Sequence, residues 1–299
     1  MSSPFAVLAP DRGLLRISGP DGRSFLQGII SNDIEKAGPE RAIWSAFLTA
    51  QGKYLHDFFI VGQEETLLLE TAAERTADLA RRLRPYRLRS KAEIEPEVSE
   101  LQVALAWGPG TAETLGLASE AGAAASFAGG VAFMDPRLPE AGARLLLPAG
   151  TAEESLREAG FQSGERADYE TLRISLGLPD GARDMEVEKA ILLENGFDEL
   201  GGVDWQKGCY LGQELTARTK YRGLVKKRLL PVRFEGAPPE PGTPILREER
   251  NVGEIFSGVE GQALALLRLN ALEGPLEAEG KPLTLARPDW VRLQAEEKV

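Results

Sequence analysis

The residues best suited to chemistry lie in one short segment that holds the chain's only cysteine. Residues 207–214 read Lys-Gly-Cys-Tyr-Leu-Gly-Gln-Glu, so Cys209 follows a lysine and precedes the expected start of a helix. Positive charge and a helix N-terminus both stabilise a thiolate, the form of cysteine that attacks electrophiles and binds metals. We therefore predict that Cys209 is a reactive thiol assisted by Lys207. The alternative is a small buried hydrophobic residue, although the flanking Gly208 and Gly212 favour an unusual backbone conformation over a simple core position.

Two basic stretches contrast with the charge of the whole chain, which is -11. Residues 205–228 hold seven lysines and arginines and one acid, and residues 81–91 hold six lysines and arginines and no acid. Clustered cations attract an anionic ligand or partner. Arg218 and Arg222 are four residues apart, so on a helix they share a face that could clamp a carboxylate or phosphate. The alternative for all these cations is a solvated surface.

The composition is that of a soluble globular protein with about two domains, because 299 residues with 42% hydrophobic content suffice for a full core. One cysteine excludes a disulfide within the chain, and with the one histidine, His56, it excludes a structural zinc site. The acidic pI, near 4.9, argues against general nucleic-acid binding. No apolar run is long enough to cross a bilayer and no targeting segment is evident, so we expect a cytoplasmic protein without membrane contact.

The cysteine count also limits the mechanism. Metal clusters are normally held by several thiolates, about four, so Cys209 could bind one only as a metal ligand shared with a partner protein. A thiol-exchange role would likewise need an intermolecular step, because no second cysteine is present to resolve a mixed disulfide. Both possibilities stay open at this point.

The order of the elements predicts an α+β fold followed by a small β-barrel. Up to residue 226, strand patterns alternate with helix patterns, as in helices packed on one face of an antiparallel sheet. Short strands separated by proline and glycine turns follow, which is typical of a barrel. We predict an α+β region over 1–226, with subdomains 1–98 and 99–226, and a barrel over 227–299. Strands are expected at 14–18, 43–48, 54–61, 66–70, 101–107, 131–134, 144–147, 229–234, 243–246, 252–257, 263–268 and 282–286, helices at 23–30, 72–83 (ending near Pro85), 111–121, 152–159 and 168–176, and a loop at 122–130.

The segment around Cys209 resembles the signature of the YgfZ family of folate-binding proteins, whose mitochondrial relatives serve iron-sulfur cluster assembly. That signature reads Lys-Gly-Cys-Tyr/Phe-x-Gly-Gln-Glu, and residues 207–214 fill every specified place. Weaker matches follow in order along the chain. They are Ser18-Gly19-Pro20-Asp21, Phe25-Leu26-Gln27-Gly28, Asn32-Asp33, Gln51-Gly52-Lys53, Tyr86-Arg87-Leu88-Arg89-Ser90-Lys91, Asp135-Pro136-Arg137, Tyr169-Glu170, Leu172-Arg173-Ile174, Ala217-Arg218 and Tyr221-Arg222-Gly223.

The resemblance implies a fold like that of the glycine cleavage T-protein, an aminomethyltransferase: a ring of ferredoxin-like α+β domains around a tetrahydrofolate site, with a C-terminal small β-barrel. T-proteins carry paired aspartates where this chain has His56-Asp57, and a pterin-holding glutamate where it has Ser175. Serine cannot offer a bidentate carboxylate to a pterin. Folate binding should then depend more on basic residues and aromatic walls.

Two functions follow from the resemblance. The first is a folate-binding accessory factor in iron-sulfur cluster assembly or repair that acts through one reactive cysteine on assembly or carrier proteins; the alternative is a tetrahydrofolate-dependent aminomethyltransferase. Turnover stays open. Tetrahydrofolate or a one-carbon derivative is the expected cofactor, with a cluster shared with a partner as a further possibility. We expect Cys209, Lys207 and Asp57 to carry the chemistry, and Tyr210, Gln213, Glu214, Arg218, Arg222, Arg87 and Arg89 to bind the cofactor. Tyr210 could instead pack in the core, and Asp57 could face solvent.

Overall fold

The computed structural model describes residues 3–63 and 65–293. The chain divides into two compact units, each assembled from segments that are not contiguous in sequence. The first unit holds the residues up to Leu48, Leu55–Tyr169 and Gly201–Leu211, and the second holds Thr49–Tyr54, Glu170–Leu200 and the residues from Gly212 onward. The predicted domain boundaries at residues 98 and 226 stay predictions, because the two units alternate along the chain.

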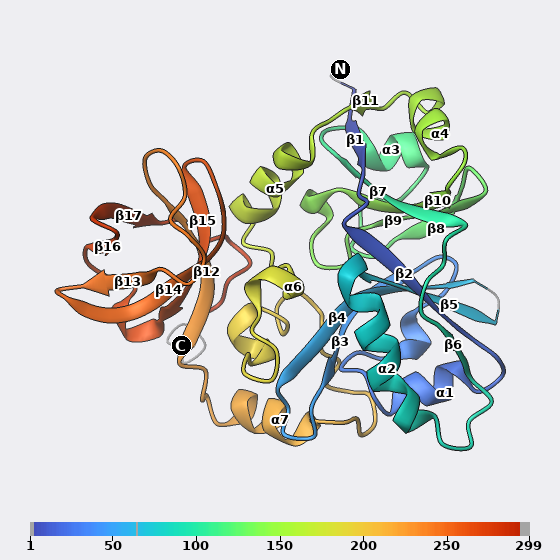
Figure 1. The fold of residues 1–299 in the computed structure, drawn as a ribbon, viewed down its shortest axis with the longest axis horizontal. Coiled ribbons are helices and arrows are strands. Elements are labelled where there is room, and N and C mark those ends of the chain that lie inside the picture. The colour runs from blue at the N-terminus through green and yellow to red at the C-terminus, as the bar shows by residue number, and fades with distance from the viewer. Residues whose placement is uncertain (1–2, 64, 294–299) are drawn as a thin grey trace. The chain divides into compact units, whose positions relative to one another are not determined.

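The first unit contains two sheets (Figure 1). One has five strands in the order β3-β4-β5-β2-β6, in which the pairs β4–β5, β5–β2 and β2–β6 are antiparallel. The other has six strands in the order β11-β1-β7-β10-β9-β8, antiparallel except for the parallel pair β1–β11. The strands are β1 (Phe5–Leu8), β2 (Arg12–Ser18), β3 (Ala42–Leu48), β4 (Tyr54–Gln63), β5 (Thr66–Ala72), β6 (Glu93–Glu95), β7 (Leu101–Trp107), β8 (Ala124–Phe127), β9 (Gly130–Met134), β10 (Ala143–Pro148) and β11 (Gln162–Ser163).

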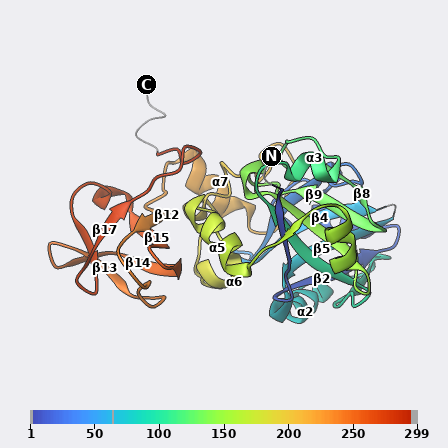
Figure 2. The same cartoon turned by 90° about the horizontal axis from the view of Figure 1, so that it is seen from above.

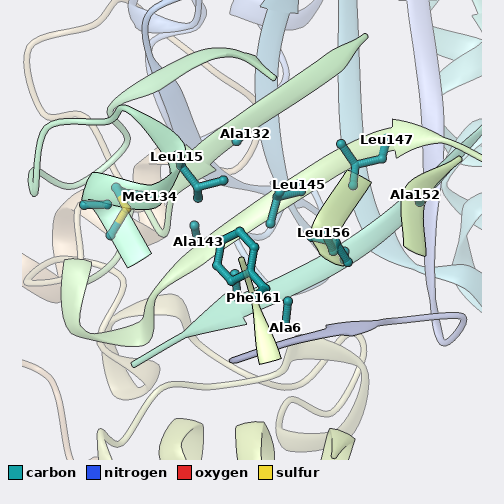
Figure 3. Close-up of a cluster of buried hydrophobic side chains, with 13 residues drawn as sticks. Ala6, Leu115, Ala132, Met134, Ala143, Leu145, Leu147, Ala152, Leu156 and Phe161 are labelled. Carbon is teal, nitrogen blue, oxygen red and sulfur yellow. The ribbon is translucent and has the colours of Figure 1, made fainter. Parts of the chain in front are cut away.

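Small and branched side chains of the six-stranded sheet form a core with two short helices, α3 (Thr111–Leu115) and α4 (Ala152–Glu158). Figure 3 shows Leu145 and Leu147 of β10 on the same side as Leu156 of α4, and all three are buried. Alternate residues of a strand point to one face, so this spacing gives the sheet one apolar surface for the helices to cover.

Helices of the first unit differ from their predicted limits by up to several residues, and α1 (Gly22–Gln27) ends before the predicted residue 30. The segment predicted as a helix over 111–121 is helical only to Leu115, because Gly116 adopts a left-handed conformation with φ 66° and ends it. Helix α2 (Thr76–Arg87) continues past Pro85. Proline removes one hydrogen bond, but its fixed φ is itself helical, so the last turn can persist. The 3₁₀ turns of this unit span Ile34–Lys36, Ala73–Arg75 and Pro139–Ala141.

A buried ionic network joins the two sheets of the first unit. Glu70 on β5 accepts hydrogen bonds from Arg12 Nε on β2 at 2.6 Å and from Arg144 Nη1 on β10 at 2.8 Å. Arg144 Nε also donates to Asp135 at 3.3 Å, and Asp135 accepts from Arg137. Asp135, Glu70 and the two arginines that meet Asp135 are buried, so these charges stabilise one another in place of water.

The second unit contains a closed barrel of six strands in the order β12-β15-β14-β13-β16-β17 (Figures 1 and 2). Five of the six were expected. The sixth, β16, was not predicted, because its three residues are too few to show a strand pattern. The strands are β12 (Lys227–Arg233), β13 (Pro244–Arg247), β14 (Arg250–Val259), β15 (Gln262–Arg268), β16 (Leu276–Ala278) and β17 (Lys281–Leu285). The helices not yet named are α5 (Arg166–Ser175), α6 (Gly181–Asp184) and α7 (Gln213–Tyr221), with 3₁₀ turns at Leu192–Asn195 and Leu269–Ala271.

A second buried network fixes helix α6 to the barrel. The pairing of β14 with β15 shifts register between Ile255 and Gly258, and the N–H of Ser257 within this bulge donates to Asp184 Oδ1 at 3.0 Å. Arg173 donates to Asp184 Oδ2 at 2.8 Å and to Ser257 Oγ at 2.8 Å. A carboxylate thus satisfies the backbone group that the bulge leaves unpaired. The predicted fold class, α+β with a C-terminal barrel, is confirmed.

Candidate functional site

The cysteine lies in a loop, residues 201–211, that docks onto the turn after α1; we call it the motif loop. Two buried side chains of that turn hold the start of the motif loop. Ser31 Oγ donates to the carbonyl of Gly202 at 2.6 Å, and Asn32 Nδ2 donates to the carbonyl of Gly201 at 2.8 Å. Buried polar groups are almost always hydrogen-bonded, so these two contacts fix where the loop enters.

Asp204 organises the middle of the motif loop. Its backbone N–H donates to the Ser31 carbonyl at 3.0 Å, and its Oδ1 accepts from the N–H groups of Gln206 at 2.7 Å and Lys207 at 3.1 Å. Lys36 forms an ion pair with Oδ2 at 2.6 Å. Burial raises the pKa of the Asp204 carboxyl, but the hydrogen bonds from Lys36 and the backbone outweigh burial and hold that pKa below its usual value. The tight turn before the cysteine is therefore held by a charged carboxylate.

The ammonium group of Lys207 points at backbone carbonyls. Its Nζ donates to the carbonyl oxygens of Ile30 and Asn32, both at 2.7 Å, and lies 5.2 Å from the ring centroid of Tyr210. The side chain of Lys207 is thus an anchor that ties the motif loop to the turn after α1. Among the sequence-predicted site residues, Lys207 and Tyr210 are the pair that these contacts bring together.

Burial of Lys207 lowers the pKa of its ammonium group to about 8, against the opposing influence of Asp33 and Asp204. The lysine is still mainly protonated near neutral pH. Its deprotonated form keeps two N–H groups, which is enough for both carbonyl partners. The anchor can therefore survive loss of the charge.

Cys209 is exposed, whereas Lys207 and Tyr210 on either side of it are each only 7% exposed. A small buried hydrophobic role is therefore not what the structure shows for this cysteine. Helix α7 begins only at Gln213, after Gly212 at φ 81°, so the thiol precedes the helix start by four residues. The motif loop displays the thiol on a backbone that is fixed on both sides.

The other predicted ligand-binding residues belong to α7, in the second unit, and to the end of α2, in the first. On α7, Gln213 and Glu214 occupy the first turn, and Arg218 is exposed one turn before Arg222, the exposed residue that ends the helix. In the first unit, Arg87 ends α2 and donates to the Ala92 carbonyl at 3.3 Å. Arg89 follows it, and both side chains are exposed.

Asp57 lies on β4 and is 9% exposed, so it does not face solvent freely. Its Oδ2 accepts from Trp44 Nε1 at 3.1 Å, and its carbonyl accepts from Thr71 Oγ1 at 2.9 Å. Ser175, at the place of a pterin-holding glutamate in T-proteins, donates to the Leu172 carbonyl at 2.8 Å. Asp57 and Ser175 therefore each make hydrogen bonds within the protein.

His56 is fully buried beside Asp57 in the sequence. Its Nε2 lies 3.0 Å from Asp78 Oδ2. Burial lowers the pKa of His56 to about 4, aided by the charge of Arg75 and opposed by Asp78. The imidazole is therefore neutral near neutral pH.

Two residues that build the site escaped the sequence analysis: Ser31 and Asp204. A sequence signal existed for Asp204, which precedes Gln206 by two residues and Lys207 by three, the spacing at which aspartate accepts from backbone N–H groups. No local signal reveals the role of Ser31, because its partner Gly202 in the motif loop lies 171 residues further along the chain.

Within the described residues, no three histidine, cysteine, aspartate or glutamate side chains gather as a metal site. Nor does any helix in the described ranges have the length and apolarity to span a membrane.

Comparison with solved structures defines the class of fold. The structure is similar to the glycine cleavage system aminomethyltransferase T from Bartonella henselae, with a TM-score of 0.78 over 97% of this chain and 87% of that one. The two sequences are 15% identical, so this likeness concerns the fold alone. Residues 226–293 match the family described as CAF17, C-terminal beta-barrel domain. The chain is thus an aminomethyltransferase T-like α+β protein with a CAF17-type barrel.

Comparison with curated sequences identifies the family. The human protein named "Iron-sulfur cluster assembly factor IBA57, mitochondrial" is 36% identical over 308 residues, which cover 93% of this chain and 83% of the human protein. The mouse protein of the same name is 33% identical with the same coverage. A homolog from Neurospora crassa is 34% identical over 276 residues, covering 85% of this chain and 60% of that protein. The chain belongs to the IBA57 family of iron-sulfur cluster assembly factors.

These names also correct one prediction. The human, mouse and Neurospora crassa relatives are each named as mitochondrial. They contradict the cytoplasmic location inferred from composition and from the start of the chain, and that inference is wrong. Residue composition by itself carries little information about the compartment in which a protein works.

Proposed function

We propose that this protein is an accessory factor in iron-sulfur cluster assembly or repair, of the YgfZ type, and that it acts through Cys209 on protein partners. The observation that carries the proposal is the exposed thiol of Cys209 between two buried anchors, Lys207 and Tyr210. A ligand that must meet iron on another protein needs both access and a fixed position. The names of the IBA57 relatives support the same role.

The cluster is the cargo in this proposal, and Cys209 supplies one of its ligands. Among the described residues, no three histidine, cysteine, aspartate or glutamate side chains gather as a metal site, so in this proposal the remaining ligands come from the partner. The thiol proton leaves to solvent when the sulfur binds iron, which the exposure of Cys209 permits. Lys207 holds the loop in this scheme, because its ammonium hydrogens are directed to the carbonyls of Ile30 and Asn32.

We also propose that a reduced folate binds this protein. The residues fit the glutamate tail better than the pterin: Arg218 and Arg222 are exposed one turn apart on α7, whereas Ser175 offers no carboxylate. Arginines pair well with carboxylates in this geometry. Calorimetry with tetrahydrofolate and its one-carbon derivatives tests this, and Arg218→Gln with Arg222→Gln should weaken binding most at low salt. Absence of binding heat with millimolar ligand at low salt would refute it.

Replacement of the thiol tests the main proposal. Cys209→Ala and Cys209→Ser should leave the thermal midpoint unchanged, since the side chain is exposed, and should abolish support of iron-sulfur enzymes in a complementation assay. Gln206→Ala is the matched control, because this exposed side chain lies in the same loop and its structural contact is made by the backbone. Full complementation by Cys209→Ala contradicts the proposal. A turnover assay with a lipoyl-bound aminomethyl carrier, run in parallel, tests the transferase alternative.

A further inference from the structure

The end of helix α2 forms an exposed surface that combines positive charge with apolar side chains; we call it the α2 surface. It consists of Arg84, Tyr86, Arg87, Leu88 and Arg89, all exposed (α2 in Figure 1). No acidic residue occurs between Asp78 and Glu93. The cations of the α2 surface therefore have no acidic neighbour in their own segment.

Asp78 is not available to neutralise this surface. Its carboxylate forms ion pairs with Arg81 and Arg82 and a hydrogen bond with buried His56. The nearby acid Asp21 accepts from the backbone N–H of Lys91 at 2.7 Å. Arg84 and Arg87 lie in the last turn, where they also favour the helix macrodipole. That effect accounts for positive charge at the helix end, and it does not account for exposed apolar side chains among the cations.

Leu88 is the most exposed large apolar side chain among the described residues, at 86%. Leu88 is the capping residue directly after α2 and has φ 45° and ψ -109°, a backbone conformation that L-residues with a side chain rarely adopt. A glycine would fit this position without strain. The chain instead exposes a leucine to solvent, close in sequence to Tyr86. Tyr86 is 42% exposed and forms a T-shaped pair with Phe47, with 5.7 Å between the ring centroids.

We infer that the α2 surface is a docking site for an acidic segment of a partner protein, with an apolar residue of that segment on Leu88 and Tyr86. Several arginines with no acidic neighbour in their own segment, on a protein of net charge -11, favour an acidic partner and steer its approach. The exposed leucine and tyrosine add an apolar contact that a simple polyanion cannot use.

A path of direct contacts within the first unit links the α2 surface to the motif loop. Tyr86 packs on Phe47, Phe47 forms a β-bridge with Ile30, and Ile30 accepts a hydrogen bond from Lys207. A partner held at the α2 surface would thus rest on the framework that anchors the loop of Cys209. Only the identity of the partner as an iron-sulfur protein rests on the proposed function; the docking site itself does not.

The test uses the full chain and a fluorescein-labelled synthetic peptide in which glutamates flank a central Leu-Phe pair. Binding of the peptide to the protein is measured by fluorescence polarisation. We expect saturable binding that weakens with salt, and about tenfold weaker binding by the Arg87→Gln, Arg89→Gln double variant. Leu88→Gly should also weaken binding while its thermal midpoint stays the same or rises, a combination that a structural role for Leu88 would not give. Arg157→Gln on α4 is the control for loss of an exposed arginine elsewhere in this unit.

Other ligands in the same assay discriminate between occupants. An all-glutamate peptide should bind more weakly than the mixed peptide, and binding of the mixed peptide should be the same with Cys209→Ala. Equal binding of both peptides together with no effect of Leu88→Gly would overturn the inference, and so would tighter binding of anionic lipid vesicles or single-stranded RNA. Because Cys209→Ala affects complementation and not docking, failure of the proposed function is distinguishable from failure of this site.

Discussion

Lys207 donates a hydrogen bond of 2.7 Å to the carbonyl oxygen of Ile30, a residue 177 positions earlier in the chain. The side chain of Lys207, two residues before the cysteine, is therefore hydrogen-bonded to the backbone of another segment of the first unit. Its carbonyl partners belong to two buried residues, Ile30 and Asn32. This relationship makes Lys207 a structural determinant of where the thiol sits.

Loss of this anchor should destabilise the protein. We expect Lys207→Met to lower the free energy of unfolding by about 2–3 kcal/mol, because two buried carbonyls lose a charged donor. Urea denaturation measures this. The control is Lys189→Met, whose side chain is 72% exposed and which should leave the free energy of unfolding unchanged. An unaltered denaturation midpoint for Lys207→Met would show that the anchor contributes little.

The same lysine should affect stability at alkaline pH. Its native pKa is about 8, below its ordinary value of 10.5, so between these values the unfolded chain binds the proton and the native state does not. The contribution of Lys207 to the free energy of unfolding should then rise with pH across this window, by about 2 kcal/mol after solvent screening. The difference in urea stability between wild type and Lys207→Met, measured from pH 7 to 10, should grow accordingly. A constant difference would place the native pKa near its ordinary value.

His56 should affect stability at acidic pH. Its native pKa of about 4 lies below the ordinary 6.5, so as pH falls through this range the unfolded chain gains a proton that the native state refuses. The stability of the wild type should decline by about 3 kcal/mol from this group alone, and His56→Gln should lack that decline. Because His56 is the chain's one histidine, its ring proton signals report the titration directly. A midpoint near 6.5 in the native state would contradict the expected neutral imidazole.

Glu70 should be essential to the first unit. Glu70→Gln removes the charge that Arg12 and Arg144 share in the interior, and we expect a loss of about 3 kcal/mol in the free energy of unfolding. Glu154→Gln is the comparison, since that carboxylate is 61% exposed in its pair with Arg157 and should have no measurable effect. Equal midpoints for the two variants would mean that the buried arginines find water or other acceptors.

The fold was predictable where local pattern decides it. The strand over 101–107 and the change to short strands after residue 226 follow from apolar composition and from proline and glycine turns. The three-residue strand β16 escaped because so short a segment has no periodicity to read. For the site, the sequence singled out Cys209 and Lys207, and assistance of the thiol by Lys207 stays a prediction. The hydrogen bonds from Lys207 Nζ to the carbonyls of Ile30 and Asn32 could not be predicted, because only the folded chain brings these residues near.

Because the first unit is assembled from separate segments of the chain, its parts leave the ribosome at different times. Its N-terminal sheets leave the ribosome early, yet Ser31, Asn32 and the Ile30 carbonyl find their partners only when the motif loop has also emerged. Until the motif loop emerges, these polar groups, which are buried in the folded protein, must form their hydrogen bonds with water. The first unit is therefore completed late, after translation has passed into the second, and a nascent chain stalled before residue 201 would hold an unfinished surface that invites chaperone binding.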